Sequence, residues 1–294
     1  MTGATNHFYT PLRYPGGKSR LASYFQRILK ENRLYDSHYI EPYAGGSGIA
    51  LTLLFTEYCS HIHLNDIYYP LFCFWTSALR NPDYLCCRIK DVQITPRVWD
   101  KQKMILKNST DYSMDEIAFA FFFLNRTNRS GILNAGMIGG RNQDGQWKID
   151  ARFNKQKLIN RINDIADYSH RISVYNMDAS DFICRILPTL PNHSLIYFDP
   201  PYYDKGRRLY ADYYENDDHQ CIASIVQKKV KQPWIMTYDN NPNVASFYQN
   251  RRWLIFSLNH TAGSFRIGKE LMVFADSVRI PEPDFAILHS NIWD

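Results

Sequence analysis

One stretch near the start of the chain restricts the fold more than any other. A short apolar run, His38–Ile40, leads into Glu41–Gly48, which contains three glycines, and a helical pattern then covers residues 49 to about 58. A second apolar run, His61–Leu64, follows and ends at Asp66. A strand, a glycine turn, a helix and a second strand that ends at an acid form the opening unit of a parallel nucleotide-binding sheet.

The second half of the chain continues this alternation of elements. Strand patterns return at Ile172–Tyr175 and at Leu195–Phe198, and a helical pattern covers about 218–230. Another strand pattern, Trp234–Thr237, precedes the stretch 251–276, which is typical of a β-hairpin. The sequence therefore predicts an α/β fold with a mostly parallel sheet that ends in a hairpin.

Residues 81–171 interrupt this pattern. Helical periodicity dominates there, broken by a polar stretch with several glycines. We predict that residues 1–80 and 172–294 form one Rossmann-like domain with a twisted sheet, and that residues 81–171 are inserted into it.

The glycine turn indicates the kind of ligand. Ligands of open parallel sheets bind beyond the carboxyl ends of the strands, where Glu41, Gly45, Gly46 and Asp66 fall. An acid about 20 residues after such glycines suits ribose hydroxyls. The glycines do not follow the dinucleotide pattern, and Glu41 would repel a pyrophosphate but suits a sulfonium or ammonium group. We expect S-adenosylmethionine, which carries both; an ordinary tight turn is the alternative.

Gly16-Gly17-Lys18-Ser19 matches the end of a phosphate-binding loop. That loop requires a glycine five positions before Gly17, and the chain has Leu12 there. A nucleoside triphosphatase of this kind is excluded.

Asp199-Pro200-Pro201-Tyr202 follows the apolar run that ends at Phe198. Two prolines fix the backbone and end the strand in a stiff turn. The Asp199 carboxylate and the Pro200 carbonyl can accept both hydrogens of a planar amine, and the Tyr202 ring can stack on the base that carries it. We expect these four residues, Pro201 included, to be catalytic and to act by positioning. An ordinary proline turn is the alternative.

Several motifs occur together in one order, and they carry a resemblance: Tyr14-Pro15-Gly16-Gly17-Lys18, Glu41-Pro42-Tyr43-Ala44-Gly45-Gly46, Asn65-Asp66, FFFLNRTNRSGI, Asp199-Pro200-Pro201-Tyr202 and GKELMVFAD. Over nearly its whole length the chain resembles the Dam-type (D12, α-class) DNA adenine-N6 methyltransferases. The resemblance implies a methyltransferase fold and S-adenosylmethionine as the donor. It also implies transfer to N6 of an adenine flipped out of duplex DNA.

The resemblance also implies roles for individual residues. Asp66 would hold the donor's ribose, Asp178 would approach its adenine, and Asp199 would touch both donor and target. The cofactor-binding set it implies is Tyr14, Pro15, Gly16, Gly17, Lys18, Glu41, Pro42, Ala44, Gly45, Gly46, Asp66, Ile67, Asp178, Ala179 and Asp199.

The insertion would then be the target-recognition domain. Arg favours guanine edges and Asn favours adenine edges. The expected contacts to double-stranded DNA are Arg126, Asn128, Arg129, Asn134 and Arg141, with Lys205, Arg207 and Arg208 beside the catalytic turn. For each insertion residue, a structural role inside its loop is the alternative. The recognition segment departs from that of GATC-methylating members, so GATC is only a guess for the target.

Composition limits the surroundings of the protein. A net charge of +5 permits a nucleic-acid partner without requiring one. The six cysteines form no Cys-x-x-Cys pair, so we expect free thiols, a cytoplasmic location and no metal. No apolar stretch approaches the about 20 residues of a membrane helix. The family allows a partner restriction enzyme or other defence proteins, which the sequence does not identify.

Two further functions stay open at this point. Adenine-N6 methyltransferases that act on RNA can share the acceptor turn, although a dedicated insertion favours duplex DNA. A catalytically inactive, DNA-binding relative is the other possibility. The intact segments Tyr14–Lys18 and Asp199–Tyr202 are evidence against it, because an inactive copy needs neither.

Overall fold

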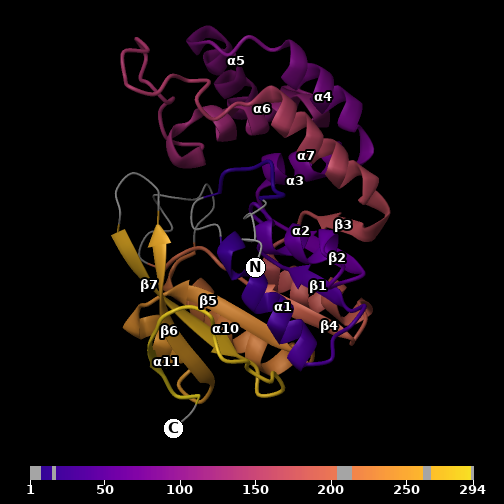
Figure 1. The fold of residues 1–294 in the computed structure, drawn as a ribbon, viewed down its shortest axis with the longest axis vertical. Helices are drawn as coiled ribbons and strands as arrows, with labels where there is room; N and C mark the ends of the chain where they lie inside the picture. Colours follow the sequence, from indigo (N-terminus) through magenta and orange to yellow (C-terminus); the bar gives the residue numbers. More distant parts are fainter. Residues whose placement is uncertain (1–7, 15–17, 204–213, 261–265, 293–294) are drawn as a thin grey trace, which may run out of the picture.

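The computed structural model describes residues 8–14, 18–203, 214–260 and 266–292. Among them, one eight-stranded sheet has the order β3-β2-β1-β4-β5-β7-β6-β8 (Figure 1). The strands are β1 (His38–Glu41), β2 (His61–Asn65), β3 (Ile172–Tyr175), β4 (Ser194–Phe198), β5 (Trp234–Asp239), β6 (Arg252–His260), β7 (Arg266–Phe274) and β8 (Ile287–Ser290).

The first five strands of this order are parallel, and the last three are antiparallel. The predicted α/β class, the mostly parallel sheet and the terminal hairpin are confirmed. β1 lies between β2 and β4, so the chain order reverses on its two sides. In open sheets of this kind the ligand crevice forms at that reversal, beyond the carboxyl ends. Glu41 ends β1, and Asp199 directly follows β4.

Helices cover the sheet and form a separate lobe above it (Figure 1). The α-helices are α1 (Ala22–Glu31), α2 (Gly48–Phe55), α3 (Tyr69–Arg80), α4 (Pro82–Asp91), α5 (Pro96–Lys107), α6 (Met114–Thr127), α7 (Lys155–Asp167), α8 (Ala179–Asp181), α10 (Asn216–Lys229) and α11 (Pro242–Phe247). Short turns are η1 (Ser19–Leu21), η2 (Ser109–Asp111), η3 (Arg129–Gly131), η4 (Ser169–Arg171), η5 (Phe182–Ile186, a π-helix) and η6 (Leu187–Thr189). None of the described helices is both long and apolar enough to cross a bilayer.

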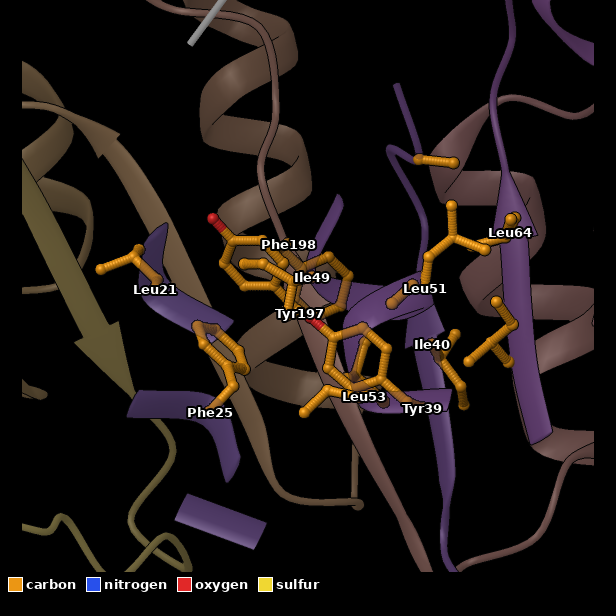
Figure 2. Close-up of a cluster of buried hydrophobic side chains, with 14 of the residues drawn as sticks. Leu21, Phe25, Tyr39, Ile40, Ile49, Leu51, Leu53, Leu64, Tyr197 and Phe198 are labelled. Atoms are coloured by element: carbon orange, nitrogen blue, oxygen red, sulfur yellow. The ribbon is translucent and has the colours of Figure 1, made fainter. Parts of the chain in front are cut away.

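The core of the sheet domain explains why α2 is apolar on every side. Figure 2 shows Ile49, Leu51 and Leu53 of α2 among the side chains of Tyr39 and Tyr197. All five residues are at most 3% exposed. A helix packed between a sheet and other elements has no solvent face, and burial of each large apolar side chain contributes about 1.5–3 kcal/mol.

The helical lobe is built around α6. Ser113 and Glu116 form a capping box that begins this helix by satisfying its first backbone N–H groups. Phe122 of α6 stacks on Phe74 of α3, with ring centroids 5.5 Å apart and planes at 7°. Residues 81–171 thus contain α4 to α7 and no strand of the sheet, while α3, on the sheet side of the predicted boundary, packs against them. The exact domain boundaries stay a prediction.

The N-terminal residues, coloured indigo, run between the two lobes (Figure 1). The Arg13 N–H donates to Asn125 Oδ1 of α6 over 2.8 Å, and Asn125 Nδ2 donates back to the Arg13 carbonyl over 2.7 Å. Gly131, with φ +76°, lies against the same carbonyl so closely that a Cβ there would overlap it. This segment therefore joins the insertion to the sheet domain.

Candidate active site

The glycine turn after β1 is shaped by positive φ angles. Gly45 has φ +46°, and a Cβ at this position would lie 2.8 Å from Cε1 of Tyr14. Glycine thus lets the Tyr14 ring lie directly on the turn. Asp66 holds the turn from the other side, because its Oδ2 accepts from the Gly45 N–H over 3.0 Å. Its Oδ1 accepts from the Tyr68 N–H, also over 3.0 Å.

A cavity of about 760 Å³ lies where the ends of these strands meet the insertion. Of the predicted cofactor residues, the following line it: Tyr14, Lys18, Glu41, Pro42, Ala44, Gly45, Gly46, Asp66, Ile67, Ala179 and Asp199. Asp178 does not line it; its Oδ1 caps α8 by accepting from the Ser180 N–H over 2.8 Å. Pro15, Gly16 and Gly17 lie outside the described residues.

Three side chains of β5 and β7 hold the Asp199–Tyr203 turn. Thr237 Oγ1 donates to Asp199 Oδ1 over 2.9 Å, and the Tyr203 N–H donates to Asp239 over 2.9 Å. The Tyr202 hydroxyl donates to Glu270 Oε1 over 2.8 Å. Asp199 and Pro201 line the cavity, whereas Pro200 and Tyr202 are buried. The turn is therefore fixed to the sheet behind it as well as stiffened by its prolines.

Lys18 is the cation of this buried group. Its Nζ lies 2.5 Å from Asp199 Oδ1 and 3.2 Å from Glu270 Oε2, and its side chain is 2% exposed. It also lies over the Tyr202 ring, 5.2 Å from the centroid. Burial opposes its charge, but the carboxylates of Asp199 and Glu270 outweigh burial, so the pKa of Lys18 lies well above its usual value.

Glu41 behaves differently, although it lines the same cavity. Burial, and then the negative charge of Asp199, raise its pKa to about 8. Burial therefore favours the protonated form of Glu41 near neutral pH. A cation placed beside it would favour the ionised form and release that proton.

The residues predicted to contact DNA fall in different surroundings. Arg126 and Asn134 line the cavity, and Arg129 is exposed. Arg141 is exposed and forms an ion pair with Asp100 over 2.6 Å. Lys205, Arg207 and Arg208 lie outside the described residues.

Asn128 is the exception, because it is fully buried. Its Oδ1 accepts from Trp99 Nε1 over 2.6 Å, and its Nδ2 donates to the carbonyls of Ile132 and Leu133. The side chain thus holds the loop that follows α6. Asn128 therefore has the structural role that was the alternative for the insertion residues.

Arg126 belongs to a cluster of arginines at the cavity, with Arg13, Arg152 and Arg161. Its guanidinium donates to the Arg152 carbonyl, and Arg161 Nη1 donates to the Thr10 carbonyl over 3.0 Å. Burial, and then the charges of Arg13, Arg161 and Arg152, lower the pKa of Arg126 to about 9. Like charges held this close favour an anion nearby.

Sequence reasoning missed several residues of this site. Glu270 and Thr237 hold the catalytic turn, and Asn125 and Arg161 hold the N-terminal segment. A signal existed for Glu270, because it is an acid at the start of the apolar run Leu271–Ala275. Asn125 lies in the motif FFFLNRTNRSGI, but no local pattern assigned a role to it, to Thr237 or to Arg161, because their partners lie far away along the chain.

The fold and the site together define a class of enzyme. The ends of the parallel strands carry a glycine turn, the acid Asp66 and the aspartate Asp199 on a rigid turn. Open parallel sheets bind their ligands at such strand ends. A family model, D12 class N6 adenine-specific DNA methyltransferase, matches residues 14–261. The chain belongs to this family and is a methyltransferase.

Solved structures show weaker likenesses. The rRNA methyltransferase AviRa from Streptomyces viridochromogenes aligns with TM-score 0.40 and 13% identity, covering 94% of both chains. A Listeria monocytogenes protein assigned to the class I S-adenosylmethionine-dependent methyltransferases aligns with TM-score 0.38 and 9% identity, over 91% of this chain and 63% of that one. Likenesses with TM-scores this low support no further conclusion about the fold. No curated protein matches the chain in sequence.

Proposed function

We propose that the chain transfers a methyl group from S-adenosylmethionine to N6 of an adenine flipped out of duplex DNA. One observation carries the proposal: Asp199, fixed by Thr237 and Lys18, borders a cavity shared by the glycine turn and the insertion. The volume of about 760 Å³ is in the upper part of the usual range for small-molecule sites. Such room suits a donor and a nucleobase together.

The residues at the cofactor end fit S-adenosylmethionine. Asp66 lines the cavity, and its two oxygens accept from the Gly45 and Tyr68 N–H groups, which fix the carboxylate as an acceptor for a ribose hydroxyl. Gly45 and Gly46 let the donor approach the backbone, while Ile67 and Ala179 offer apolar surface. Glu41 lines the cavity, and a cationic group beside it would favour its ionised form. When bound, S-adenosylmethionine supplies a methyl group on a positively charged sulfur.

The residues at the target end position the amine. Lys18 and Thr237 both contact Oδ1 of Asp199, and no described residue donates to Oδ2. We assign Oδ2 and the Pro200 carbonyl to the two hydrogens of the adenine amine. Acceptors on both hydrogens localise the nitrogen lone pair toward the donor, so the acceleration comes from fixed geometry rather than a strong base.

On the DNA side we assign phosphate and base contacts to the helical lobe. In support of this assignment, Arg126 and Asn134 line the cavity, and Arg129 and Arg141 are exposed. The arginine cluster around Arg126 favours a phosphate, which would relieve the repulsion among its members. We also assign phosphate contacts to Lys205, Arg207 and Arg208.

The test is a transfer assay with methyl-labelled S-adenosylmethionine and either duplex DNA or RNA, followed by nucleoside analysis. We expect label in N6-methyladenine of DNA. The Asp199→Ala variant should still bind DNA but transfer no methyl group. Label confined to RNA, label in cytosine, or an unchanged rate in Asp199→Ala would each refute the proposal.

A further inference from the structure

The turn that carries Asp199 is supported by a residue from the far end of the chain, Glu270. β7 pairs antiparallel with β5, so Glu270 lies opposite Asp239, and Met272 lies opposite Thr237. Opposed residues of neighbouring strands share a face, as do residues two apart on one strand. Thr237, Asp239 and Glu270 therefore form one row of side chains beneath the catalytic turn.

Glu270 differs from the other two in what it contacts. It is 1% exposed, and each of its oxygens engages a different functional group. Oε1 accepts from the Tyr202 hydroxyl over 2.8 Å, and Oε2 lies 3.2 Å from Lys18 Nζ. Burying a carboxylate this deeply is costly unless it is paired and hydrogen-bonded, and Lys18 and Tyr202 supply these partners.

The contact with Lys18 determines which oxygen of Asp199 stays accessible. A lysine ammonium is a compact charge on a flexible stem, and with one carboxylate as its only anchor it can move between both oxygens. Glu270 draws the ammonium to one side, where it contacts Oδ1 of Asp199 at 2.5 Å. Oδ2 then remains the acceptor for the target amine.

We infer that Glu270 is a positioning residue for methyl transfer: it fixes Lys18 and Tyr202 so that Asp199 presents Oδ2 to the substrate. The inference rests on the proposed function. Glu270 does not line the cavity, so it acts through its two neighbours.

The test compares Glu270→Ala, Glu270→Gln and Val273→Ala. Val273 is a buried residue of the same strand that points to the opposite face, so its truncation serves as the control for lost stability. Glu270→Gln keeps the size and an acceptor for Tyr202 but loses the charge that holds Lys18. Each variant is compared with the wild type in single-turnover methyl transfer to duplex DNA, in affinity for S-adenosylmethionine, and in melting temperature.

We expect Glu270→Ala to lower the transfer rate by about tenfold or more, since small misplacements of reacting groups cost up to about 100-fold. Affinity for S-adenosylmethionine should change less than about threefold, because this binding energy comes from other residues. Glu270→Gln should recover part of the rate, and Val273→Ala should keep it.

A wild-type rate in Glu270→Ala would overturn the inference. So would an equal loss in Val273→Ala, or a loss that lies entirely in donor affinity. If the wild-type protein itself methylates no adenine in DNA, the proposed function fails instead, which separates the two conclusions.

Discussion

Lys18 offers the most informative perturbation of this site. In Lys18→Met the side chain keeps its length, but Asp199 and Glu270 lose the ammonium that lies 2.5 and 3.2 Å from them. Both Lys18 and Glu270 have side chains only 2% exposed. Removing one partner of a buried ion pair costs about 3–5 kcal/mol. For a chain of this size that corresponds to a fall of roughly 10 °C in melting temperature.

The pH dependence of this loss gives a second check. Burial already raises the pKa of Glu270, and Lys18 opposes that rise. The pKa of Glu270 already lies above its unfolded value, and in Lys18→Met it rises further. The stability of the variant is then best near or below the unfolded pKa and falls as pH rises through the folded pKa. The deficit against the wild type should therefore be larger at pH 8 than at pH 5.5, as measured by thermal unfolding.

A surface ion pair serves as the control for Lys18→Met. Arg171 holds Glu57 with two hydrogen bonds of 2.9 Å, but the Glu57 side chain is 60% exposed. Glu57→Ala should cost at most about 1 kcal/mol. A Lys18→Met protein that melts within about 2 °C of the wild type, as Glu57→Ala should, would refute the reasoning on the buried pair.

Three other predictions concern the cofactor end and the sheet. Asp66→Ala removes the acceptor of two backbone N–H groups, at a cost of about 1–3 kcal/mol, and calorimetry should show about tenfold weaker donor binding or more; wild-type affinity would contradict the role of Asp66. Burial raises the pKa of Glu41 to about 8. Because the ionised form suits a cationic donor, donor affinity should rise between pH 7 and 9, and Glu41→Gln should flatten that rise. Equal slopes in the two proteins would exclude Glu41 as the titrating group. Burial, with the charges of His61 and His38, lowers the pKa of His63 to about 3. On acidification the unfolded state therefore binds a proton before the folded state does. The free energy of unfolding should fall by up to about 1.4 kcal/mol for each pH unit below about 6.5. His63→Asn should lessen this acid sensitivity in denaturant unfolding, and an unchanged slope would assign it elsewhere.

The sequence predicted those parts of the fold that depend on local patterns. The apolar runs that lead to Glu41, Asp66 and Asp199 form strands of the parallel sheet. A strand buried on both faces is apolar, and the acid at or just after its last residue marks where it ends. The hairpin of β6 and β7 was predicted from the local pattern of the stretch 251–276. β8 was missed, because it is a short edge strand whose side chains are intermediate or exposed and do not alternate between buried and exposed.

The residues that hold the catalytic turn could not be predicted, because their contacts depend on which strands become neighbours in the sheet. Lys18 meets Glu270 only because β7 pairs with β5 next to β4. Asn128 illustrates the opposite difficulty: an asparagine in a polar loop has the composition of a DNA contact, and only the packing of Trp99 shows that it holds the loop from inside. The spacing of motifs along the sequence identifies which residues lie at the site. The side chains around each residue in the folded protein determine its role.

The central claim is that Asp199, held by Lys18 on one oxygen, receives the target amine on the other. A crystal structure of the protein with duplex DNA and S-adenosylhomocysteine tests it most directly. We predict an extruded adenine with N6 at about 3 Å from Asp199 Oδ2 and from the Pro200 carbonyl, while Lys18 stays on Oδ1. An adenine bound elsewhere in the cavity, with Asp199 turned away from both base and donor, would contradict the account.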